Sequence, residues 1–272
     1  MKKILKSCSV TLAGLVAASC AAQQPLDSHD HYESFNRKTY QFNKAVDTVV
    51  FKPIAYSYSK VVPSFVQNRV LNAYDNVYEV PTIANDLLQF RLIYALADTA
   101  RLIMNSTVGI AGLFEVAEKV GLPKHKNDFG LTLAYWSAQP KRYGYFVVPF
   151  LGPNSFRGTI GIAVDSLFNP ITYVKPAWTS YALYGGRLIT KRAELLPSDK
   201  MVDEAFDPYV FVRSAYIQNQ DVAVEDLALS YRDYQYKYLP PDVYNRAVAP
   251  IDKSKHNVGT TPQPNAPVRS LN

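Results

Sequence analysis

Cys20 is the residue whose type and position point most directly to chemistry. It ends a short leader in which residues 1–6 include three lysines, residues 9–18 are small and apolar, and residues 17–20 read Ala-Ala-Ser-Cys. This order is typical of a lipoprotein signal, in which the leader 1–19 is removed and the cysteine thiol receives acyl chains. Acylation would anchor the chain to a membrane without a spanning helix. The alternative is an ordinary secretory leader, which leaves a soluble periplasmic protein after cleavage near Ala18, Ala21 or Ala22.

The other chemically capable residues form no catalytic or metal-binding motif. The four histidines stand at positions 29, 31, 125 and 256, without the His-Glu-x-x-His spacing of a zinc site. Ser155 follows Gly-Pro-Asn and lacks the second glycine of a nucleophile elbow, so it suits a helix cap. His125 with Asp128 fits either a metal or water site or a solvated loop, and residues 29–31 fit either a weak metal site or a hydrophilic tether. We predict no catalytic residue, no metal and no cofactor.

Composition indicates a globular domain and excludes several classes of protein. The chain is 48% apolar and 19% charged, which is too apolar for a disordered protein. Its net charge of +6 includes three leader lysines, and the remaining excess forms no basic stripe, so we expect no nucleic acid partner. Both cysteines lie in the first 20 residues, which leaves no disulfide pair in the mature chain. The 20 tyrosines suit either a membrane–water boundary or a tyrosine-rich core and surface.

The elements that must position any site are predicted to be helical almost throughout. Apolar residues recur at three- and four-residue spacing, and Pro, Gly and capping residues mark the helix ends. We expect Pro53 to end the first helix or the turn after it, and Pro81 to end the second helix. We expect Asp207 to cap a late helix that begins at Pro208. The expected helices cover residues 32–49, 64–80, 83–105, 113–120, 155–169, 178–196 and 208 onward.

The helix expected at 83–105 differs from the others because its polar residues form one narrow line. Arg91, Asp98, Arg101 and Asn105 share that line with Tyr94, and the rest of the circumference is apolar. A helix that is apolar nearly all round is either buried in protein or surrounded by lipid. The pattern leaves both interpretations open. Outside the leader no run of 18 apolar residues could span a membrane as a helix.

Two stretches are not predicted to be regular helix. Residues 129–153 are rich in Gly and Pro, and a short strand at 146–150 is limited by Pro149. Residues 239–272 are polar and rich in proline, and we expect a disordered tail. The predicted organisation is therefore a signal peptide at 1–19, an acylated tether at 20–31, a helical domain at 32–238 and the tail.

Eight segments occur in the order of a known family pattern. They are residues 35–43 (FNRKTYQFN), 81–89, 101–117, 128–133 (DFGLTL), 148–157, 165–170, 192–199 and 207–218 (DPYVFVRSAYIQ). Together they resemble the VacJ/MlaA phospholipid-binding lipoproteins of Gram-negative outer membranes. Phe90 and Ala111 stand where the family pattern has glycine.

This resemblance implies an all-α fold: a single ring-like helical domain with a central amphipathic channel and an irregular Gly/Pro-rich middle segment. It implies a protein held in the inner leaflet of the outer membrane, lipid-anchored on the periplasmic side and associated with a trimeric porin. Such proteins take mislocalised phospholipid from the outer leaflet and pass it to a soluble periplasmic carrier, which maintains lipid asymmetry. They are not enzymes.

The resemblance also implies roles for particular residues. Cys20 would carry the acyl chains, and Phe42 and Asn43 would gate or brace the ring. The helix 155–169, with Gly158 and Gly161, would form the channel wall. Arg157 and Asp165 on that helix would meet lipid headgroups, or form a buried pair, or be plain surface charges.

Two other functions remain to be compared with phospholipid transfer. One is a non-transporting scaffold lipoprotein that organises porins or the envelope. The other is a lipid hydrolase, which the missing nucleophile–base constellation argues against.

Overall fold

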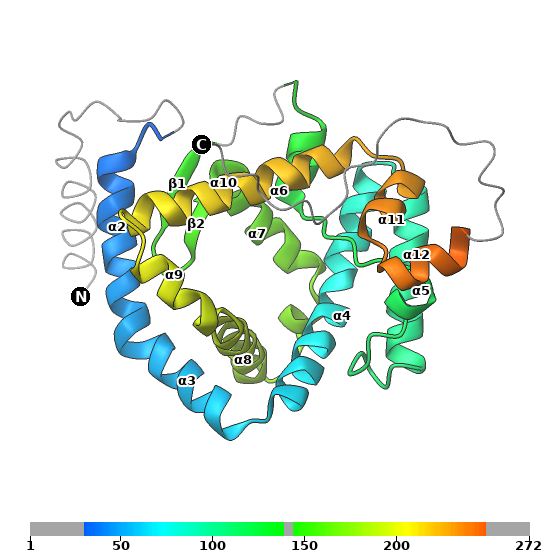
Figure 1. Cartoon of the computed structure of the whole chain (residues 1–272), viewed down its shortest axis with the longest axis horizontal. Coiled ribbons are helices and arrows are strands. Elements are labelled where there is room, and N and C mark those ends of the chain that lie inside the picture. The colour runs from blue at the N-terminus through cyan, green and yellow to red at the C-terminus, as the bar shows by residue number, and fades with distance from the viewer. Residues whose placement is uncertain (1–29, 139–143, 249–272) are drawn as a thin grey trace, which may run out of the picture.

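A computed structural model describes residues 30–138 and 144–248 of the chain. Within these ranges the fold is all-α apart from one hairpin, and its helices surround an open centre (Figure 1). In the view of Figure 1, α2 and α3 form the left side, α4 the right side, and α10 crosses the top. The elements are α2 (Glu33–Val46), α3 (Lys52–Val61), α4 (Ser64–Leu88), α5 (Leu92–Thr107), α6 (Phe129–Tyr135), β1 (Tyr145–Val148), β2 (Gly152–Ser155), α7 (Phe156–Phe168), α8 (Ala177–Leu195), α9 (Asp199–Asp203), α10 (Pro208–Leu227), α11 (Tyr231–Tyr238) and α12 (Pro241–Val248).

Two predicted helix starts are confirmed by their caps. The Ser155 hydroxyl accepts a hydrogen bond from the backbone N–H of Gly158 at 3.0 Å and begins α7. The Asp207 carboxylate accepts from the N–H groups of Tyr209 and Val210, and Pro208 occupies the first position of α10. Both caps satisfy N–H groups that have no partner inside their helix.

Two prolines that were expected to end helices do not end them. Pro53 lies in the first turn of α3, where a missing N–H breaks no hydrogen bond, and a π-helical turn at Asp47–Phe51 joins α2 to α3. Pro81 lies inside α4, which continues to Leu88. Helix α4 packs against α5, α7 and α8, and this tertiary support sustains the helix across the lost hydrogen bond.

The helix expected at 83–105 is divided between α4 and α5. The chain turns at Phe90, which has a φ of 57°, and Ala111 has a φ of 55° in the next turn region. The family pattern has glycine at both positions. In this chain, Phe90 and Ala111 have the left-handed backbone conformation that glycine adopts most easily. The helix expected at 113–120 is only a short 3₁₀ turn at Glu118–Val120, and Gly121 (φ 93°) ends it as predicted.

The Gly/Pro-rich middle contains a two-stranded antiparallel hairpin. Tyr145 pairs with Ser155 and Val148 pairs with Gly152. The expected strand therefore begins one residue earlier and ends before Pro149, which lies in the turn. The hairpin turn points Phe150 and Leu151 away from the strands, and both side chains are largely exposed.

At both ends, the folded domain extends into the segments predicted as tether and tail. Asp30, assigned to the tether, is fully buried and accepts a hydrogen bond from the Asn36 amide at 2.7 Å. Helix α12 lies in the segment assigned to the tail, and both Leu239 before it and Val243 within it are buried. The signal peptide, Cys20 and residues 249–272 lie outside the described ranges.

Many of the buried side chains of the domain are polar. Of the ten bulkiest nearly fully buried side chains in the described ranges, Val147 alone is apolar, and the others include Arg101, Gln89 and Asn105. Apolar faces point outward instead: Phe42 is 45% exposed, Leu96 70% and Ile160 53%. Apolar residues of α4 and α7 are exposed as well: Val66 is 41% exposed, Phe156 52% and Leu167 62%.

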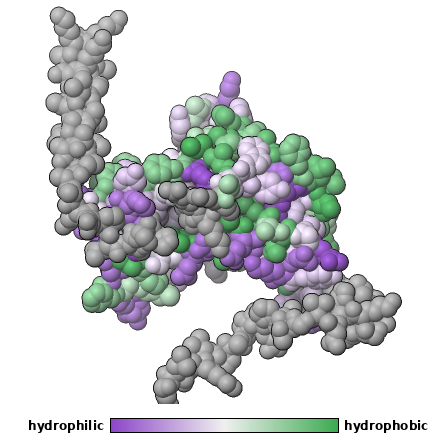
Figure 2. Space-filling model, turned by 90° about the horizontal axis from the view of Figure 1, so that it is seen from above, coloured by the Kyte–Doolittle hydropathy of each residue, from purple (hydrophilic) through white to green (hydrophobic). Residues whose placement is uncertain are grey.

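Figure 2 shows hydrophobic surface over much of the upper face of the molecule, interrupted by hydrophilic patches. This arrangement reverses that of a protein surrounded by water and suits an outer face that contacts lipid or another protein. None of the helices in the described part of the chain combines the length and hydropathy needed to cross a membrane.

Candidate functional site: a passage through the ring

The largest cavity inside the ring lies between α4, the segment before α6, α7 and α8. Its volume is about 930 Å³, at the upper end of the range of about 300–1,000 Å³ for small-molecule pockets. The wall combines apolar and charged groups. It includes Tyr78, Pro81, Leu151, Ile162 and Leu188 together with Glu79, Lys124, Asp165, Arg187 and Lys191.

Two further cavities adjoin the first at the tip of the hairpin. One of about 600 Å³ lies between α2, the hairpin, α8, α9 and α10, and shares Leu151 and Leu188 with the largest cavity. The other, of about 250 Å³, is lined by Leu151, Arg157 and Gly158. Leu151 therefore stands where all three cavities meet, and its side chain is 59% exposed.

Asn43 and Phe42 hold the hairpin tip in place. The Asn43 amide donates to the carbonyl of Val148 at 2.9 Å, and its oxygen accepts from the N–H of Phe150 at 2.7 Å. Phe42 packs edge-on against the Phe150 ring, with the centroids 5.1 Å apart. Phe150 needs this support because its φ of 65° is unfavourable for a bulky residue. The two predicted residues thus contact the element that carries Leu151.

Basic groups gather on the α8 side of the largest cavity. Arg187 lies over the Tyr78 ring at 3.8 Å, and its Nη2 is 3.7 Å from Asp75 Oδ1. Lys124 and Lys191 line the same cavity, and Lys124 also pairs with Asp75. These cationic groups line the same cavity as Leu151, Ile162 and Leu188, so its wall carries both charged and apolar groups. Such a wall can contact both parts of an amphipathic molecule.

Asp165 is the predicted site residue that lines the largest cavity. Its carboxylate accepts hydrogen bonds from the Asn85 amide at 2.7 Å and from the N–H of Phe129. Burial raises the pKa of Asp165 to about 6, and its hydrogen bonds only partly oppose this shift. The carboxylate therefore orders the start of α6 while it faces the passage.

The glycines of α7 act mainly in helix packing. A Cβ on Gly161 would lie 2.7 Å from the backbone N of Gly130, and α6 crosses α7 at that point. Helix α6 packs against Gly161, which lines none of the three cavities, and its place in the channel wall stays a prediction. A Cβ on Gly158 would lie 2.2 Å from Asn154 Oδ1, so substitution there would disturb the start of α7. Arg157 and Gly158 line only the smallest cavity.

The narrow polar line of α5 is buried among other polar groups. Arg101 is fully buried, with its Nε 3.2 Å from Glu79 Oε1 and its Nη2 3.0 Å from Glu115 Oε1. His125, for which a solvated loop or a site with Asp128 was expected, is instead buried beside Asp98 at 3.0 Å. Sequence spacing revealed the line itself, but its partners come from α4 and from the segment after α5.

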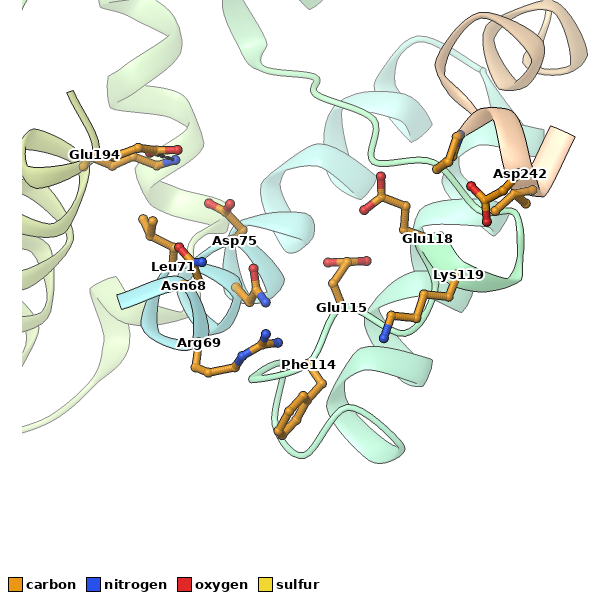
Figure 3. A pocket seen from close by; sticks show the side chains of 14 residues that line it. Asn68, Arg69, Leu71, Asp75, Phe114, Glu115, Glu118, Lys119, Glu194 and Asp242 are labelled. Atoms are coloured by element: carbon orange, nitrogen blue, oxygen red, sulfur yellow. Dashed lines mark hydrogen bonds and ion pairs between the residues drawn. The ribbon is translucent and has the colours of Figure 1, made fainter. Parts of the chain in front are cut away.

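A separate polar groove opens on the outside of the ring, with a volume of about 850 Å³. Figure 3 shows Asp75 from α4 and Glu115 and Glu118 from the segment after α5 around this groove, with Asp242 of α12 at its far side. The groove meets the largest cavity only at Asp75 and Lys191. Because its wall is mainly charged, it lacks the apolar side that distinguishes the passage.

Comparisons with known proteins agree on one family. The sequence model of the MlaA lipoprotein family matches residues 28–223. The chain is 34% identical over 202 residues to an uncharacterised protein of Rickettsia prowazekii, covering 74% of this chain and 80% of that protein. It is 28% identical over 230 residues to the "Intermembrane phospholipid transport system lipoprotein MlaA" of Escherichia coli K12, covering 81% and 88%.

A solved structure described as "Structural basis for maintenance of bacterial outer membrane lipid asymmetry" has the same fold. The TM-score is 0.62 at 29% identity, over 72% of this chain and 98% of that one. The all-α ring predicted for this chain is therefore confirmed by both its own structure and a solved relative.

Proposed function

The chain belongs to the MlaA lipoprotein family, and from that premise we propose that it removes mislocalised phospholipid from the outer leaflet of the outer membrane. It passes the lipid to a soluble periplasmic carrier for return toward the inner membrane, which maintains the lipid asymmetry of the outer membrane. The Escherichia coli relative, named an intermembrane phospholipid transport lipoprotein, supports this assignment.

The observation that carries the proposal is that three cavities meet at Leu151 inside a ring with an apolar exterior. Moving a charged headgroup through hydrocarbon is costly, whereas a passage lined by Arg187 and Lys191 offers the phosphate a partner. Leu151, Ile162 and Leu188 in the same lining offer contact to the acyl chains. The lipid then moves passively, and the protein needs no catalytic step.

The exposed apolar faces of α2, α5 and α7 support a location within the inner leaflet of the outer membrane. Acyl chains on Cys20 would hold the ring there from the periplasmic side. A trimeric porin is the proposed neighbour in the membrane, and the periplasmic carrier is the proposed acceptor. Phe42 and Asn43 are proposed to set the position of the hairpin that narrows the passage.

A substitution at Leu151 tests transfer through the passage. Leu151→Trp adds bulk at the junction of the cavities without filling a packed core, because the leucine is largely exposed. We expect a several-fold slower transfer of phospholipid from donor vesicles carrying the chain to a purified periplasmic carrier. Leu195→Trp is the matched control, since Leu195 is 56% exposed on the same ring but lines none of the three cavities.

The same experiment separates transport from a scaffold role. A scaffold lipoprotein would keep its porin association and its envelope phenotype in Leu151→Trp as in Leu195→Trp. Equal transfer by both variants would refute the passage.

A further inference from the structure

Three potential metal ligands from different segments meet beside the largest cavity. Asp86 comes from α4, Asp98 from α5 and His125 from the segment before α6. His125 Nδ1 lies 3.0 Å from Asp98 Oδ2 and 3.5 Å from Asp86 Oδ2. One ligand atom from each residue lies within 4.8 Å of the other two, and all three residues are at most 4% exposed.

The two carboxylates are not satisfied by the hydrogen bonds around them. Asp86 Oδ1 accepts from the Asn127 amide at 2.8 Å, but Asp86 Oδ2 is buried without a hydrogen-bond donor. Asp98 Oδ1 is also buried without a donor, and its nearest cationic atom in the described residues is Arg101 Nε at 4.0 Å. Buried polar atoms of this kind require a partner, and a buried charge requires one more strongly.

Further carboxylates gather around the site. Glu79 and Glu115 join Asp86 and Asp98 around Arg101 and His125. A divalent cation would bind where the unpartnered oxygens of Asp86 and Asp98 lie.

The spacing of the ligand atoms fits a small divalent ion. Ligand atoms about 2.0–2.2 Å from zinc in a tetrahedral site lie roughly 3.3–3.6 Å from one another, close to the 3.0 and 3.5 Å found here. Outer contacts already orient the ligands: Asn127 holds Asp86, and the rings of Tyr94 and Tyr234 pack against His125 with centroids 4.7 and 5.2 Å away. Such outer contacts are typical of metal sites.

We propose that Asp86, Asp98 and His125 bind one structural divalent transition-metal ion of the zinc class. An imidazole nitrogen with two carboxylates suits Zn²⁺ or Mn²⁺ better than Ca²⁺, which takes six to eight oxygen ligands. The ion ties α4 to α5 and to the segment that leads into α6, and so stiffens the wall of the largest cavity. This inference does not depend on what passes through that cavity.

Metal content and thermal unfolding of the full-length chain test the proposal. The protein is purified without a histidine tag, stripped with chelator and titrated with Zn²⁺ or Mn²⁺. We expect one ion per chain by mass spectrometry of metals and a Tm increase of roughly 5–10 °C at 100 times the Kd. Co²⁺ in place of Zn²⁺ should give the visible absorption of a tetrahedral nitrogen–oxygen site, a result that needs no variant.

Three variants locate the site. Asp98→Asn and His125→Gln should each weaken metal binding at least tenfold and abolish the Tm increase, whereas His31→Gln removes an exposed histidine and should change neither. The proposal is overturned if micromolar Zn²⁺ or Mn²⁺ neither raises the Tm of the wild-type chain nor leaves an ion bound to it. In that case, a shared proton would link the three side chains. It is also overturned if binding is lost in His31→Gln but kept in His125→Gln.

Discussion

Ala111 has a backbone conformation that is unfavourable for residues with a Cβ. Its φ is 55°, and the left-handed region costs an L-residue roughly 1–2 kcal/mol relative to glycine. The residue is exposed, so its methyl group contributes little packing. The turn around it satisfies its backbone groups, with the N–H of Ala111 bonded to the Ser106 carbonyl at 2.9 Å. The turn is therefore maintained by its surroundings rather than by the preference of this residue.

We expect Ala111→Gly to raise the free energy of unfolding by about 1 kcal/mol, because strain is released and no contact is lost. The matched control is Ala100→Gly inside α5, where glycine should lower it by about 1 kcal/mol. Urea unfolding of both variants measures the difference. A loss of stability in Ala111→Gly equal to that in Ala100→Gly would contradict the assigned conformation.

Asp165 should make stability depend on pH. Its folded pKa of about 6 lies above the ordinary value of 3.8, so the folded state disfavours the charged carboxylate. The free energy of unfolding should therefore fall as the pH rises from about 4 to 6, by at most about 3 kcal/mol, and stay lower above that range.

Asp165→Asn keeps an oxygen acceptor for Asn85 and Phe129 but cannot become charged. We expect this variant to lose that pH-dependent fall. Its free energy of unfolding, relative to that of wild type, should therefore rise between pH 4 and 7. Asp203→Asn changes a half-exposed carboxylate paired with Lys44 and should leave the fall in place. Denaturant unfolding across this pH range provides the measurement, and parallel curves for wild type and Asp165→Asn would count against the buried carboxylate.

At the scale of elements, α5 is the clearest case of a helix with its faces reversed. Tyr94, Asp98, Arg101 and Asn105 are buried, whereas Leu96 on the opposite face is 70% exposed. Burying the polar line is possible because Glu79, Glu115 and other side chains pair with it. The apolar face is then free to lie against lipid.

Leu96→Glu should detach the ring from membranes without unfolding it. In a Cys20→Ser background, which lacks the acylation site, we expect Leu96→Glu to lower the membrane-bound fraction several-fold in a flotation assay. The free energy of unfolding should change by less than about 0.5 kcal/mol, because the leucine packs against no core. Lys119→Glu, an exposed charge reversal off α5, is the control and should float like the parent. Equal flotation of the two variants would argue against lipid contact by α5.

Sequence periodicity predicted most helices but not which face of each is buried. The spacing in α2, α4 and α7 marked an apolar face, and the usual assignment of that face to the core assumes that water surrounds the protein. Asn36, fully buried in α2, and Asn85, fully buried in α4, show that this assumption fails here. Only the polar line of α5 was unusual enough to leave a lipid-facing interpretation open.

The candidate site was predicted in part, for reasons that differ among its residues. Asn43 and Asp165 lie in segments that match the family pattern, so the resemblance pointed to them. Arg187 and Leu151 were missed because they come from α8 and the hairpin tip, which meet only in the folded ring. Sequence cannot tell a glycine that faces a cavity from one that admits a crossing helix, and Gly161 contacts α6.

At the scale of the whole molecule, the polar interior and the apolar exterior belong to one arrangement. The buried ion pairs of Arg101 join α4 to α5, while Asn43 joins α2 to the hairpin. These polar links leave apolar side chains for the outside of the ring and for one side of the passage. Leu151 lies where the three cavities meet, and it is therefore the position past which we propose that a transported lipid moves.

Site-specific photocrosslinking at Leu151 tests this claim most directly. A photoreactive amino acid is placed at Leu151 or, as the control, at Leu195, and the chain is irradiated in its native membrane. The passage predicts that phospholipid is crosslinked at Leu151 well above the level at Leu195, and that Leu188→Trp, on the opposite wall, reduces this signal. Equal crosslinking at the two positions, or none at Leu151, would contradict it.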